Sequence, residues 1–149
     1  MKIVKNIGLL LLATFIFSSC TANDEEMASP SPTNVAPVNG KFFSAIEAAR
    51  PITFRWTPLV PKPRENVTYR LRVWQLMQGQ NGTQAMRNNA PVIIKEVINN
   101  NYTTVSNLYT GPCKPPYLCD FIWSVELIAH NGSASGNDPI TSTPTVFNF

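Results

Sequence analysis

Apolar and polar residues alternate along much of the chain after residue 40, and this period of two constrains the fold more than any other feature. The longest alternation has apolar residues at every second position from Phe121 to Ala129. Successive side chains of a β-strand point to opposite faces, so such a run predicts a strand with one buried face. The further runs that predict strands are 52–56, 67–73, 91–98, 102–108 and 146–149.

Turn signals separate these runs, and only one short segment has helical character. The turn signals are Asn39-Gly40, Asn81-Gly82 and Asn131-Gly132, pairs that tolerate positive φ. Residues 44–50 resemble a short helix that Pro51 stops, and we interpret them as a connector. Strands at this spacing without long helices predict an all-β fold, a single β-sandwich over residues 39–149. Trp56 and Trp123 are assigned to its core.

Residues 1–19 have the order of a secretory signal peptide. Lys2 and Lys5 precede an apolar run over residues 7–17, which is shorter than the roughly 20 residues that span a bilayer. The segment Phe17-Ser18-Ser19-Cys20 then resembles the lipobox of bacterial lipoproteins. That resemblance implies cleavage before Cys20, acylation of its sulfur and amine with chains such as palmitate, and a membrane anchor. An ordinary signal peptide with a chance cysteine is the alternative.

Residues 20–38 have the composition of a tether between this anchor and the sandwich. An acidic triplet, residues 24–26, is followed by Pro30, Pro32 and Pro37, which favour an extended, semi-stiff spacer. The triplet is either simply solvated or, by resemblance, the acidic export signal of lipoproteins that are flipped to the outer cell surface. The expected location is therefore the outer membrane, at the cell surface, with the periplasmic face as the alternative.

Charge and cysteine content exclude some classes of partner. Without Lys2 and Lys5 the chain has ten basic and nine acidic residues. This near balance, without a clustered basic face, does not predict nucleic-acid binding. Cys113 and Cys119 remain in an oxidising compartment and predict a disulfide that closes a short loop. His130 is the only histidine, so no metal site and no cofactor is expected.

Several of the predicted strands resemble those of a fibronectin type III domain. The matching segments are Ile52-x-Phe54-x-Trp56-x-Pro58 for its second strand, Tyr69-x-Leu71-x-Val73 for its third, Phe121-x-Trp123-x-Val125-x-Leu127 with Asn131-Gly132 for its sixth, and Ser142 to Phe147 for its last. The resemblance covers residues 34–149. It implies an immunoglobulin-like or fibronectin-like sandwich whose role is adhesion, spacing or recognition.

One strand face is a candidate ligand surface. Arg70, Arg72 and Trp74 share the face of their strand that points away from the core, and an exposed row of this kind can stack cations on an aromatic ring. The alternative is an ordinary cross-strand ion pair, in which Glu126 of the neighbouring strand binds Arg70 or Arg72.

A second candidate surface is the loop of the cysteine pair. Tyr109 and Tyr117 flank it, and prolines 112, 115 and 116 stiffen it, so it is either a rigid contact surface for a sugar or protein or merely a cap on the sandwich.

No reaction centre is evident in the sequence. The carboxylates are scattered, and no nucleophile has a partner at a recognisable spacing. We therefore expect a non-catalytic, lipid-anchored module of the cell envelope that mediates protein–protein interaction or adhesion. The alternative is a carbohydrate-binding module that uses Trp74, Tyr109 and Tyr117.

Overall fold

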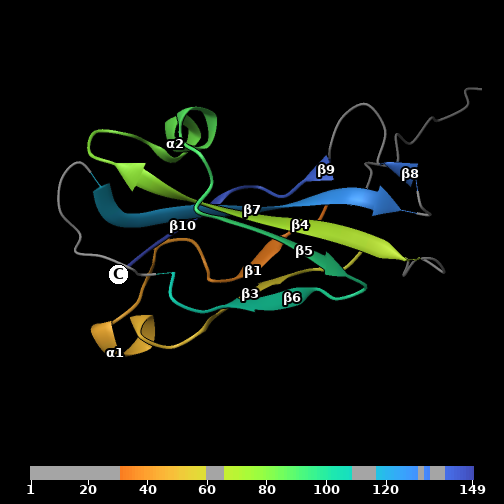
Figure 1. Cartoon of the computed structure of the whole chain (residues 1–149), viewed down its shortest axis with the longest axis horizontal. Coiled ribbons are helices and arrows are strands. Elements are labelled where there is room, and N and C mark those ends of the chain that lie inside the picture. The colour runs from red at the N-terminus through yellow and green to blue at the C-terminus, as the bar shows by residue number, and fades with distance from the viewer. Residues whose placement is uncertain (1–30, 60–65, 109–116, 131–132, 135–139) are drawn as a thin grey trace, which may run out of the picture.

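The strands form two sheets that pack face to face in the computed structural model, which describes residues 31–59, 66–108, 117–130, 133–134 and 140–149 (Figure 1). The smaller sheet has the order β1-β3-β6, made of β1 (Asn34–Ala36), β3 (Ile52–Trp56) and β6 (Tyr102–Val105). The larger sheet has the order β2-β10-β7-β4-β5, made of β2 (Lys41–Phe42), β10 (Thr145–Asn148), β7 (Tyr117–His130), β4 (Val67–Met77) and β5 (Ile93–Ile98). Two short strands, β8 (Ser133–Ala134) and β9 (Ile140–Thr141), also pair with β7. This architecture confirms the predicted all-β sandwich.

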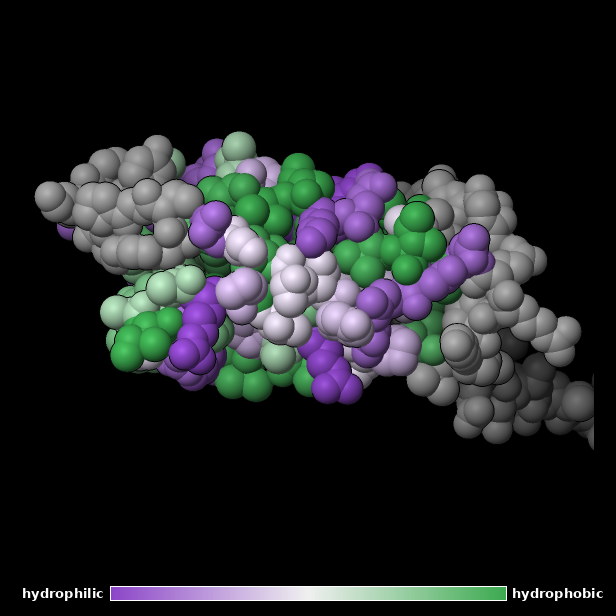
Figure 2. All heavy atoms as spheres, turned by 60° about the horizontal axis from the view of Figure 1, so that its bottom comes forward, coloured by the Kyte–Doolittle hydropathy of each residue, from purple (hydrophilic) through white to green (hydrophobic). Residues whose placement is uncertain are grey.

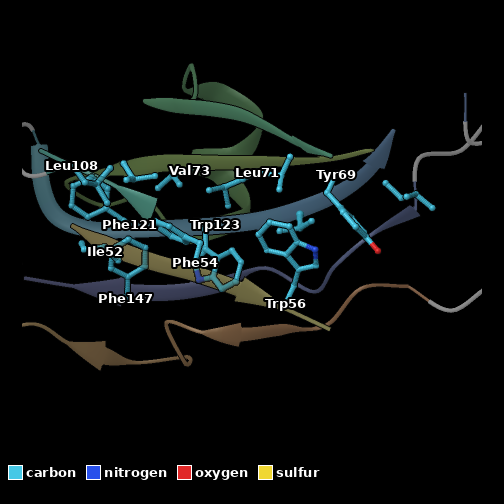
Figure 3. Packing of buried hydrophobic residues seen from close by; sticks show 14 of the residues in the cluster. Ile52, Phe54, Trp56, Tyr69, Leu71, Val73, Leu108, Phe121, Trp123 and Phe147 are labelled. Atoms are coloured by element: carbon cyan, nitrogen blue, oxygen red, sulfur yellow. The ribbon is translucent and has the colours of Figure 1, made fainter. Parts of the chain in front are cut away.

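The core lies between the sheets and is built from alternate residues of β3, β4 and β7 (Figure 3). Leu71 of β4 lies opposite Val125 of β7 in the antiparallel register, and neither side chain is exposed. The ring of Phe54 meets that of Trp123 edge-on, with centroids 5.2 Å apart and planes at 75°. Trp56 and Trp123 are fully buried, which confirms their assignment to the core.

The last strand closes this core. The Phe147 ring of β10 stacks on Phe121 with centroids 5.5 Å apart and planes at 16°, and it meets Phe54 edge-on at 5.8 Å. β10 also pairs with β2 in parallel, so the last strand joins a segment near the start of the domain in one sheet.

The sandwich begins earlier than the boundary predicted at residue 39. Residues 34–36 form β1, which pairs with β3, and Pro32 is fully buried. The Asn34 amide donates hydrogen bonds to the Trp123 carbonyl (3.2 Å), the Thr143 carbonyl (3.0 Å) and the Thr145 hydroxyl (2.9 Å). Polar residues and prolines are typical of a spacer, but here hydrogen bonds hold them in the fold.

Two short helices accompany the strands in the described residues. The predicted connector contains α1 (Ala45–Ala48), whose first turn is closed by a capping box between Ser44 and Glu47. The second helix, α2 (Gly82–Asn88), was not predicted, and the expectation of a turn at Asn81-Gly82 is wrong. Asn81 is instead the N-cap, whose side-chain oxygen accepts from the Gln84 N–H while the Gln84 side chain accepts from the Asn81 N–H. Because only Ala85 of α2 is buried, no apolar period of 3.6 residues announces it.

Tyr69 carries a hydroxyl at the edge of the core. Its ring meets Trp56 at 5.5 Å, and the Leu59 N–H donates to its hydroxyl oxygen over 3.2 Å. Burial raises the pKa of the Tyr69 phenol above its ordinary value, and the hydrogen bond from Leu59 opposes that rise only in part. The unfolded chain therefore loses the Tyr69 proton at a lower pH than the folded protein. The contribution of Tyr69 to the free energy of unfolding is fully present below a pH of about 10 and declines as the pH rises toward the folded pKa.

We expect Tyr69→Phe to weaken the alkaline loss of stability. At pH 7 the substitution should cost only about 1 kcal/mol, for the lost acceptor of the Leu59 N–H. Between pH 9 and 11 the free energy of unfolding should then fall less steeply than in the parent, because one proton-linked group is gone. Urea denaturation across this pH range measures both slopes, and equal slopes would contradict the role given to Tyr69.

Candidate binding surface

The helix α2 covers one end of the outer face of the larger sheet and leaves the rest of that face uncovered (Figure 1). Trp74 lies opposite Ile122 in the register, and both pack with Leu76 beneath Ala85 of the helix. Trp74 is therefore only 5% exposed, and the prediction that it stands exposed beside the two arginines is wrong. The reason is that α2, which follows β4 after a short connection, folds back over the end of that strand and supplies a second apolar layer outside the sheet.

Arg70 and Arg72 form a charge ladder with two glutamates on the uncovered part of this face. Arg72 binds the Glu126 carboxylate at 2.8 Å, and Arg70 lies 3.8 Å from it. Arg70 also binds Glu96 of β5 at 2.8 Å, so the ladder crosses β7, β4 and β5. This confirms the alternative in which Glu126 forms an ordinary cross-strand ion pair.

The ladder is balanced in charge but uneven in burial. The Glu126 side chain is 13% exposed, whereas that of Glu96 is 53% exposed. Two cations therefore neutralise a carboxylate that is largely removed from water, while the second carboxylate remains accessible at the end of the row.

A shallow hollow of about 500 Å³ lies between this ladder and α2. It is lined by Arg70, Arg72, Trp74, Met86, Asn89, Pro91, Ile94 and Glu96. The structure thus brings the three predicted strand residues to one hollow, although Trp74 presents little of its ring. Sequence reasoning missed Asn89, whose amide donates to the Gln75 carbonyl (2.8 Å) and the Gln80 side chain (2.8 Å), because these contacts follow from the fold of the whole 75–89 segment.

Apolar side chains beside the hollow are exposed along β5 and at Val92, the residue before it. Val92 is 47% exposed, Ile94 60% and Ile98 62%. Ile94 and Ile98 share the outer face of β5 with Glu96, because residues two apart in a strand point the same way. The result is an apolar–acidic–apolar row at the border of the sheet.

A second hollow, of about 430 Å³, lies near α1. Apolar atoms also gather at the end of the sandwich that carries α1 (Figure 2), where Phe42 is 62% and Ile46 72% exposed. Glu47 lines this second hollow. Hydrogen bonds from the Ser44 backbone N–H and hydroxyl, together with the nearby Lys41, lower the pKa of its carboxyl group. Of the predicted ligand contacts, the three whose side chains the structure describes, Arg70, Arg72 and Trp74, do not line this hollow.

The predicted cysteine loop is only partly placed. Cys20, Tyr109 and Cys113 lie outside the described residues, and Tyr117 begins β7 with no description of its side chain. Cys119 is buried. The pairing of Cys113 with Cys119 and the contact surface around it stay predictions.

Two further properties concern the described residues alone. They hold no group of three or more histidine, cysteine or acidic side chains arranged to bind a metal ion. None of their helices has the length and apolar character required to cross a membrane.

Comparison with known proteins adds no relative, since no family model, curated protein or solved structure matches the chain.

Removing the two ladder carboxylates should have unequal effects. We expect Glu126→Gln to lower the free energy of unfolding by about 2 kcal/mol, because it leaves two arginines without their shared partner. The matched change Glu96→Gln should cost less than about 1 kcal/mol, because water already solvates that group. Urea denaturation of both variants measures the difference, and equal losses would show that burial does not set the strength of this ladder.

Proposed function

We propose that this chain is a non-catalytic, lipid-anchored module of the cell envelope that mediates protein–protein interaction or adhesion. The observation that carries the proposal is the uncovered outer face of the larger sheet, where a neutral charge ladder, a hollow and exposed isoleucines of β5 adjoin. Exposed apolar side chains bordered by polar groups are typical of surfaces that recognise other proteins.

The order of the strands supports the fibronectin-like part of the proposal. In immunoglobulin-type sandwiches the third, sixth and last strands are neighbours in one sheet, and the first, second and fifth share the other. The orders β4-β7-β10 and β1-β3-β6 have this arrangement when they are taken as those strands. Such domains serve recognition and spacing more often than catalysis, although a fold alone does not fix a function.

The membrane part of the proposal rests on the sequence of residues 17–20. In this proposal acylated Cys20 holds the protein in the outer membrane, and the Cys113–Cys119 disulfide stabilises the domain in that oxidising compartment. The acidic triplet at residues 24–26 favours the cell surface over the periplasmic face.

A carbohydrate ligand is the alternative function. The hollow places Asn89, Glu96 and two arginines around an indole, which is the mixture of groups that sugars contact. The Trp74 ring is nearly covered by α2, however, so the described lining of the hollow offers no open aromatic face for a sugar to stack on. A protein partner accounts better for the exposed isoleucines.

The anchor is tested with Cys20→Ser. We expect the parent protein to fractionate with membranes and its N-terminal peptide to carry acyl chains by mass spectrometry, whereas the variant is soluble. Protease added to intact cells should remove the parent domain if it faces outward, and should reach it only after the outer membrane is opened if it faces the periplasm. A Cys20→Ser protein that stays membrane-bound would refute the lipid anchor.

The interaction surface is tested by photo-cross-linking in cells. A benzoylphenylalanine in place of Ile94 should yield a discrete adduct with a second protein, because Ile94 borders the hollow and the charge ladder. The same group in place of the exposed Arg55, on the smaller sheet, is the control and should not yield that adduct. Equal cross-linking from both positions would show that the outer face of the larger sheet is not the specific surface.

A further inference from the structure

β5 is an edge strand of the larger sheet, and one row of its backbone N–H and C=O groups pairs with no described strand. The sheet ends at β5, which pairs only with β4 among the described strands. The Asn99 N–H donates to the Val67 carbonyl over 2.8 Å, and the register continues with Val97 opposite Tyr69 and Lys95 opposite Leu71. Because bonding alternates along an antiparallel strand, the backbone groups of residues 95 and 97 point to β4. Those of Ile94, Glu96 and Ile98 point away from it.

Among the described strands, β5 is the longest edge strand of the sandwich. Among the described strands at sheet ends, β2 has 2 residues, β1 has 3 and β6 has 4, whereas β5 has 6. Short border strands are one way in which proteins prevent pairing with other chains. The Lys95 ammonium bonds to the Thr104 carbonyl over 2.9 Å, so this side chain is turned toward the smaller sheet and leaves the outer face of β5 uncovered.

We propose that β5 binds an extended segment of the partner protein as an additional strand of the larger sheet. The segment would place a lysine or arginine opposite Glu96, between two apolar residues opposite Ile94 and Ile98. This inference rests on the proposed function and specifies the partner's chemistry. Main-chain hydrogen bonds supply affinity in this mode of recognition, and alternate side chains supply specificity.

Charge complementarity selects the basic residue. Opposite side chains of neighbouring strands lie close enough to interact, and opposite charges there are favourable. Glu96 shares Arg70 with Glu126, so the ladder ends at a carboxylate that is 53% exposed on the free side of the sheet. A cation on the added strand would continue the alternation of charge across one more strand.

The same charges disfavour a second copy of this chain as the occupant. Antiparallel pairing requires opposite residues to share a face, which leaves two registers that overlap β5 most fully. One aligns Ile94 with Ile98 of the copy and places Glu96 opposite Glu96. The other places Lys95 opposite Lys95. Like charges directly opposite are destabilising.

The test is a titration of the purified full-length protein with synthetic peptides, followed by amide NMR shifts and calorimetry. The probe is an acetylated and amidated Thr-Val-Thr-Lys-Thr-Val-Thr peptide. The matched peptide has Glu in place of Lys, and a third carries N-methyl groups on alternate residues. We expect the Lys peptide to bind about tenfold more tightly than the Glu peptide, with shifts centred on β5. The third peptide, whose N-methyl groups block the backbone edge that would pair with β5, should not bind.

Three variants test strand addition and its preference for charge. Ile94→Pro removes a backbone N–H that takes no part in the hydrogen bonds between β5 and β4. The domain should therefore fold while peptide binding is lost. Ile94→Thr keeps that N–H and should still bind. Glu96→Gln should abolish the preference between the Lys and Glu peptides.

The outcomes distinguish this inference from the proposed function. Unchanged binding by folded Ile94→Pro, or binding of the N-methylated peptide, overturns strand addition. If no peptide binds while Ile94 still cross-links a protein in cells, strand addition is wrong and the interaction module stands. If peptides bind but Cys20→Ser remains in membranes, the anchor is wrong and the strand site stands. A dimer that forms without peptide and is lost in Ile94→Pro would make a second copy the occupant and overturn the partner proposed here.

Discussion

The antiparallel pairing of β4 with β7 is the constraint on which the rest of the structure depends. It runs from Val67 opposite His130 to Met77 opposite Tyr117 and forms the middle of the larger sheet. Since side chains alternate, the register that holds from Tyr69 opposite Leu127 to Gln75 opposite Phe121 sends Leu71 and Val125 into the core and Arg72 to the outer face. A slip of one residue would exchange the two faces and place arginines against the aromatic core. The aromatic layer and the charge ladder are therefore two results of the same pairing.

Sequence patterns predicted the elements whose signal is local. The alternation in residues 52–56, 67–73 and 121–129 predicted the strands of the core and the burial of Trp56 and Trp123, because these follow from a period of two. The alternative in which Glu126 pairs with the arginines also required the strands of 67–73 and 121–129 to be neighbours, which the resemblance to a fibronectin type III domain implied. The helix α2 was missed because its contact with the sheet depends mainly on Ala85, a single small residue. The burial of Trp74 follows from the same helix, which covers it after the short connection at the end of β4.

The candidate surface was predicted in part. Arg70 and Arg72 could be placed on the outer face from their own strand, but the role of Glu96 required the order of the sheet. A less regular run of residues, 91–98, indicates a strand without revealing which neighbour it has or whether its second side is free. Sheet order is set by contacts between distant segments, and no pattern within β5 encodes it. The boundary at residue 39 was placed too late because Asn34 is held by hydrogen bonds to distant groups.

The three hydrogen bonds of Asn34 also determine how mechanical load enters the domain. Its own strand belongs to the smaller sheet, while its amide bonds to Trp123, Thr143 and Thr145 on the side of the larger one. A pull on the segment that precedes it is thus shared between both sheets from the first residue of β1. Peeling β1 away from β3 requires breaking the amide contacts at the same time. Any tether attached ahead of this residue would transmit tension through the sandwich as a unit, rather than unzip it from its first strand.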